Sequence, residues 1–208
     1  MEQKGEAYGK KYIFKERERA LEAVYFHDQD AKLIEKLRES AKLEEIAKAL
    51  AEKLQVDNPA LLHRVMELGV TLDIAPAFLL APLVQVAWAE GEVTAREHQT
   101  VLRLAGTRGV EESSPAHAQL LTWLRERPPD TLFDTATEVI KVGLSVLPPR
   151  EQEERVKRIV EACHEVAEAS GGLAKVLGLG NGVSGEEASL LDTITTTLRG
   201  HRRLEKDA

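Results

Sequence analysis

The stretch from Ile74 to Ala89, IAPAFLLAPLVQVAWA, is strongly apolar and decides the fold class of this sequence, because Gln85 is its only polar side chain. A helix that spans a bilayer needs roughly 20 apolar residues, and this stretch has 16. Pro82 also interrupts the stretch, and a proline inside a helix removes a hydrogen bond and bends the chain. We therefore expect a buried central helix with a kink, and no membrane-spanning segment.

Amphipathic segments at helical spacing flank this stretch on both sides. Aromatic residues make up only 4% of the chain, so the core must consist of Leu, Val, Ile and Ala, which suits interlocking helices. No segment alternates apolar and polar residues in the way that strands do. Capping residues and prolines mark the expected helix starts, which lie at Asn58-Pro59, Thr94, Ser114-Pro115, Pro128-Pro129 and Pro148-Pro149. The predicted fold is an all-α bundle of several helices.

The chain is expected to have three parts. Residues 1–56 form charged amphipathic helices, residues 57–200 form the main helical domain, and residues 201–208 form a polar tail. Apolar residues make up 43% and charged residues 30%, a composition typical of a folded, water-soluble protein. The net charge of -7 argues against a nucleic-acid partner, which requires Lys and Arg gathered on one face.

Two features favour a cytoplasmic location. The N-terminus carries no apolar segment of signal-peptide length. The single cysteine, Cys163, excludes an internal disulfide, so a reducing compartment is the simpler assumption. Cys163 lies on an apolar helical stripe with Val156 and Val166, where it is expected to pack as a small hydrophobic residue rather than act as a nucleophile. No other arrangement of residues in the sequence resembles a catalytic site, and no enzyme activity is expected.

A weak internal repeat links two stretches about 90 residues apart. The first copy, VAWAEGEVTARE, runs from Val86 to Glu97. The second copy begins with VAEASG at Val166 and resumes with VSGEE at Val183, after a glycine-rich insertion. Both copies have the order helix, glycine turn, Val, Thr or Ser, two further residues, Glu, helix.

This repeat resembles the TerB-like family, named after a bacterial tellurite-resistance protein, in which each helical half carries a turn of the form Ala-x-Ala-Asp-Gly-x-Val-Ser-x-x-Glu. The match covers roughly residues 60–199. It departs from the family before the turn glycine, where Glu90 and Ser170 replace the favoured Asp. The resemblance implies a pseudo-twofold helical core and a role in bacterial stress responses, often with membrane-associated or metal-linked complexes. It does not imply a reaction.

Three carboxylates of the first turn, Glu90, Glu92 and Glu97, are the candidate metal ligands. Hard oxygen ligands on a tight turn would suit Mg²⁺ or Ca²⁺. The competing interpretation is structural, because Thr94-x-x-Glu97 has the pattern of a capping box and the second repeat has the same pattern starting at Ser184. Capping is the preferred interpretation, so no cofactor is expected, with Ca²⁺ or Mg²⁺ as the alternative.

The glycine-rich insertion, residues 170–183, is the candidate interaction loop. It combines flexible glycines with aliphatic side chains that need cover from the parent domain or from a partner. These side chains are Leu173, Val176, Leu177 and Leu179. The expected function is that of a non-enzymatic, protein-binding TerB-like module of bacterial stress response. The partner is unidentified and a homodimer stays open. The alternative is a divalent-cation-binding protein that uses Glu90 and Glu92.

Overall fold

The protein is described here from a computed structural model, which covers residues 29–30, 32–170 and 183–200. Helices account for 77% of these residues, and no strand occurs among them. The prediction of an all-α fold is therefore confirmed. Within the same residues, no helix combines the length and the apolar character needed to cross a membrane.

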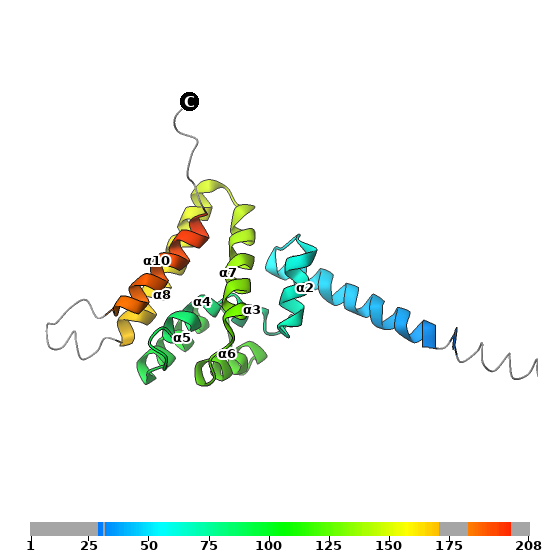
Figure 1. The fold of residues 1–208 in the computed structure, drawn as a ribbon, viewed down its shortest axis with the longest axis horizontal. Helices are drawn as coiled ribbons and strands as arrows, with labels where there is room; N and C mark the ends of the chain where they lie inside the picture. Colours follow the sequence, from blue (N-terminus) through cyan, green and yellow to red (C-terminus); the bar gives the residue numbers. More distant parts are fainter. Residues whose placement is uncertain (1–28, 31, 171–182, 201–208) are drawn as a thin grey trace, which may run out of the picture. The chain divides into compact units, whose positions relative to one another are not determined.

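Helices joined by short turns make up the described chain (Figure 1). Residues 29–30 and 32–54 are helical, and the chain divides into two units between Ile46 and Ala47. In the second unit the named helices are α2 (Pro59–Glu67), α3 (Ala75–Phe78), α4 (Ala81–Ala87), α5 (Ala95–Thr107), α6 (Pro115–Arg125), α7 (Asp130–Ser145), α8 (Pro149–Ser170) and α10 (Gly185–Arg199). Each of the five helix starts expected from the sequence coincides with the start of one of these helices.

The central apolar stretch forms two short helices, α3 and α4, rather than the single kinked helix that its sequence predicts. Pro76 and Pro82 each lie in the first turn of one of these helices. A proline is tolerated there because that turn needs no N–H, whereas inside a continuous helix its ring would clash with the preceding turn. Leu79 and Leu80 form the connection. The second proline therefore breaks the helix instead of bending it.

Helix α4 is the centre of the second unit. All its residues except Gln85 are buried, and it packs against α5, α6, α7, α8 and α10. α8 also packs against α5 and α10, and α7 also packs against α10. The contacts of α5 with α8 and of α10 with α4 form a crossed pattern between the two repeats. Trp88, at the end of α4, is partly buried, and its indole Nε1 donates a hydrogen bond to the carbonyl of Trp123 at 2.8 Å.

The end of the helix over residues 32–54 packs into this core, since Leu50 and Leu54 are buried. The helix closes with a hydrogen bond of 3.0 Å from the Val56 N–H to the Ala51 carbonyl. Gln55, between them, has a φ of 55°, in the left-handed region that helix ends usually fill with glycine. Residues 47–56 thus belong to the second unit, which begins at Ala47.

Replacing Gln55 by Gly should stabilise the protein. A residue with a Cβ in the left-handed region costs roughly 1–2 kcal/mol, and the greater freedom of glycine in the unfolded chain offsets part of that gain. We expect the free energy of unfolding to rise by about 0.5–1 kcal/mol, measured by urea denaturation. Gln55→Ala is the control, because it removes the same side chain but keeps the Cβ. Equal stability of the two variants would contradict the explanation.

Candidate functional site

The two copies of the repeat each begin a helix with a capping box. In the first, the carboxylate of Glu97 accepts a hydrogen bond from the Thr94 N–H at 2.7 Å, and the Thr94 hydroxyl accepts one from the Glu97 N–H at 3.3 Å. In the second, the same pair of bonds joins Ser184 and Glu187 at 2.7 and 3.2 Å. The sequence prediction of capping at both positions is therefore confirmed.

The two capping glutamates are buried, with exposed fractions of 2% for Glu97 and 0% for Glu187. Glu187 also accepts a hydrogen bond from the Ser170 hydroxyl at 3.0 Å. Burial raises the pKa of the Glu97 carboxyl, hydrogen bonds from Thr94 oppose this increase, and the negative charges of Glu187 and Glu90 add to it. The charge of the second capping glutamate therefore acts on the first, although 90 residues separate them in the sequence.

The three predicted metal ligands do not share one environment. Glu90 and Glu92 are exposed on the turn, while the Glu97 side chain turns inward to its cap. Among the described residues, no three or more His, Cys, Asp or Glu side chains are grouped so that they could hold a metal ion. Cation binding by this turn stays a prediction. The predicted interaction residues Leu173, Val176, Leu177 and Leu179 lie outside the described residues.

Cys163 is fully buried on α8, as its apolar stripe predicts. Burial raises the pKa of its thiol to about 12, and the nearby positive charge of Arg108 opposes that increase. The thiol is therefore protonated at neutral pH, and a protonated thiol is a poor nucleophile. Cys163 serves as a core residue.

A groove that the sequence analysis did not predict lies beside α8. It consists of two adjoining hollows of about 390 and 370 Å³, which share Lys53, Leu79, Arg155 and Ile159. Its apolar floor includes Leu79, Leu80, Leu83, Ile140, Leu144 and Ile159. Leu79, 36% exposed, is one of the few large apolar side chains of the second unit that face solvent. We call this feature the α8 groove.

Positive charge lines the α8 groove. Its charged lining residues are Lys53, Arg108 and Arg155, and no carboxylate lines either hollow. All three side chains are exposed, and none forms an ion pair with another described residue. Arg108 instead donates a hydrogen bond to the Leu104 carbonyl at 3.1 Å. A site with unpaired cations is unusual on a chain whose net charge is -7.

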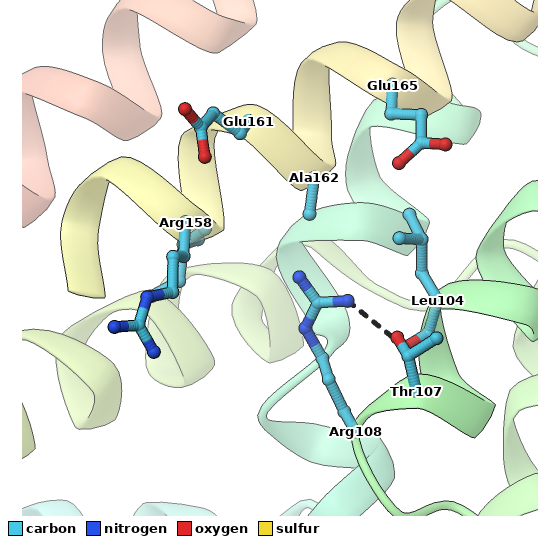
Figure 2. Close-up of a pocket in the computed structure, with 8 residues that line it drawn as sticks. Leu104, Thr107, Arg108, Arg158, Glu161, Ala162 and Glu165 are labelled. Atoms are coloured by element: carbon cyan, nitrogen blue, oxygen red, sulfur yellow. Dashed lines mark hydrogen bonds between the residues drawn. The ribbon is translucent and has the colours of Figure 1, made fainter. Parts of the chain in front are cut away.

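A third hollow, of about 510 Å³, continues the α8 groove beyond Arg108 and Ile159 (Figure 2). The guanidinium of Arg108 lies between α5 and α8, below Ala162, with its hydrogen bond to Leu104 drawn as a dashed line in Figure 2. Two carboxylates, Glu161 and Glu165, line this end. Each already has a cationic partner, Lys157 at 3.7 Å and Arg103 respectively.

The pH dependence of stability should reveal the buried Glu97. Because its pKa is raised in the folded protein, the folded state binds the proton more readily than the unfolded chain does. The ionised carboxylate thus lowers stability at neutral pH, and this loss is recovered as pH falls through the raised pKa toward the ordinary value of 4.5. Glu97→Gln can keep the cap. We expect this variant to be stabilised relative to the parent at neutral pH, with a gain that shrinks on acidification in urea unfolding; a gain independent of pH would contradict this.

Loss of one cap should be costly whether or not a cation is present. Thr94→Ala removes the hydroxyl that accepts from the Glu97 N–H, and it should lower the free energy of unfolding by about 1 kcal/mol. Thr122→Ala is the control, since the Thr122 hydroxyl bonds only within exposed helix surface. A chelator should leave the melting temperature of the parent unchanged. A fall of many degrees would show instead that a bound ion holds the turn.

Comparison with known proteins finds no relative of this chain. A scan of the chain against protein-family models finds no match, and searches of curated proteins and of solved structures find none either. The resemblance to the TerB-like family therefore depends on the sequence repeat alone.

Proposed function

We propose that this chain is a non-enzymatic, TerB-like helical module of the cytoplasm, which acts in bacterial stress response by binding another protein. Two observations support the proposed likeness to the TerB-like family. Thr94 and Ser184 each begin a helix with the same capping box. The crossed packing of α5 against α8 and of α10 against α4 is what a twofold relation between the two repeats would produce.

The observation that carries the binding role is the α8 groove. An apolar surface left in contact with water is unfavourable and commonly marks a site for a partner. Leu79 is exposed at the position that both hollows share, and the cations around it have no carboxylate partner among the described side chains. A bound protein would cover both.

Divalent-cation binding at the first turn is the second candidate. It is supported by the mutual repulsion of the carboxylates near Glu97, whose pKa the charges of Glu187 and Glu90 help to raise. A cation would relieve that repulsion. Calorimetry with Ca²⁺, Mg²⁺ and Zn²⁺ separates the two functions, because heat of binding that disappears in a Glu90→Gln and Glu92→Gln double variant would favour the cation.

Binding through the α8 groove should depend on Leu79. Leu79→Ser removes the exposed apolar side chain of the groove, while Val146→Ser removes one that is 67% exposed and does not line it. We expect each change to cost less than about 1.5 kcal/mol of stability. The binding effects should differ. With the photo-crosslinker benzoylphenylalanine at Thr107, in cells that naturally make the protein, Leu79→Ser should abolish the protein adduct and Val146→Ser should not.

Two results would contradict the proposal. One is the absence of any protein adduct at Thr107, which lines the hollow that continues the groove. The other is an adduct that both serine variants reduce equally, since an equal reduction would indicate non-specific association through exposed apolar residues and not a defined site.

A further inference from the structure

We infer that the segment bound in the α8 groove is an acidic amphipathic helix of the partner protein, with its apolar face on Leu79 and Ile159 and its carboxylates against Lys53, Arg108 and Arg155. This inference rests on the proposed function, because it specifies which chemistry the protein partner presents.

The length of the groove suits a short helix. Along α8, the residues that line the α8 groove and the third hollow that continues it run from Arg155 to Glu165. The two carboxylates at the far end, Glu161 and Glu165, are already paired with Lys157 and Arg103. Ten residues of α-helix span about 15 Å, so a partner helix of about three turns would extend over the groove and the third hollow together. Such a helix presents its large apolar side chains at intervals of three and four residues, in a row on one face. A row of this kind can contact the apolar floor, to which α8 contributes Ile159 and α7 contributes Ile140 and Leu144.

The depth of the groove favours inserted side chains over a flat surface. The floor residues Leu80, Ile140 and Leu144 are only 6%, 8% and 5% exposed, so they lie recessed below the exposed Leu79. A membrane surface would contact the rim of such a groove and leave its floor uncovered. Apolar side chains on a helix can reach into recesses of this kind, which is how amphipathic helices dock in grooves.

The positive charge around the floor favours a partner segment that carries negative charge. Lys53, Arg108 and Arg155 come from three separate parts of the fold, and no carboxylate among the groove residues neutralises them. The remainder of the chain is acidic enough to give a net charge of -7. An acidic segment is therefore repelled by the surface in general and attracted at this groove, which favours one docking position.

The experiment compares three synthetic helical peptides that share one leucine stripe and differ only in the flanking residues, which are Glu, Gln or Lys. Fluorescence anisotropy with the full chain measures their affinities. We expect the Glu peptide to bind about tenfold more tightly than the Gln peptide and the Lys peptide to bind most weakly. The advantage of the Glu peptide should shrink as salt is added, since salt screens exposed charges.

A matched pair of double variants locates the effect. Lys53→Gln with Arg155→Gln removes two groove cations, and Lys48→Gln with Arg150→Gln removes two exposed cations of the same two helices that do not line the groove. The first variant should lose the preference for the Glu peptide, and the second should keep it. Melting temperatures of both variants confirm that the fold is intact.

Several outcomes overturn the inference. They are the absence of binding by the Glu peptide, equal binding of the three peptides, and equal loss of preference in the two double variants. Binding of phosphatidylglycerol vesicles or of oleate that depends on Lys53 and Arg155, without peptide binding, would identify a lipid ligand and overturn it as well. A protein adduct that depends on Leu79 but is unaffected by the charge variants would leave the proposed function standing and reject only the acidic helix.

Discussion

A helix without a polar face imposes the arrangement of the second unit. α4 buries every residue except Gln85, so it has no side that can face water, and helices from both halves of the repeat must enclose it. The burial of apolar surface supplies the driving force, and no other part of the described chain is enclosed by so many elements. The crossed packing of α5 on α8 and of α10 on α4 follows from that constraint. α4 belongs to the first repeat, and α8 and α10 of the second repeat cover it together with α5, α6 and α7.

The two capping glutamates are both buried in this arrangement, and the negative charge of Glu187 helps to raise the pKa of Glu97. A buried carboxylate is tolerated when the backbone supplies hydrogen bonds, and each of these two accepts one from the N–H of its cap residue. Glu97, one of the three metal ligands predicted from the sequence, is therefore a structural residue whose hydrogen bonds cap the start of a helix.

The α8 groove arises where the chain around α4 cannot close completely. Pro82 ends α3 at a turn, and the turn leaves Leu79 at the surface instead of in the core. Gln55, which has a left-handed conformation after the helix over residues 32–54, lines the same groove. A strained residue and an exposed apolar residue in one groove are features that stability alone does not favour. Both become understandable if the groove binds a partner.

The helical class, the helix starts and both capping boxes could be predicted from the sequence, because these features depend on neighbours three or four residues apart. The paired signals at Thr94 with Glu97 and at Ser184 with Glu187 were sufficient for this. Three features became known only from the packing of distant segments: Pro82 separates two helices, the charge of Glu187 acts on Glu97, and Lys53, Leu79 and Arg155 line one groove. Local sequence patterns do not specify which distant helix faces contact each other. Those contacts are set when the apolar faces of several helices pack against α4 together.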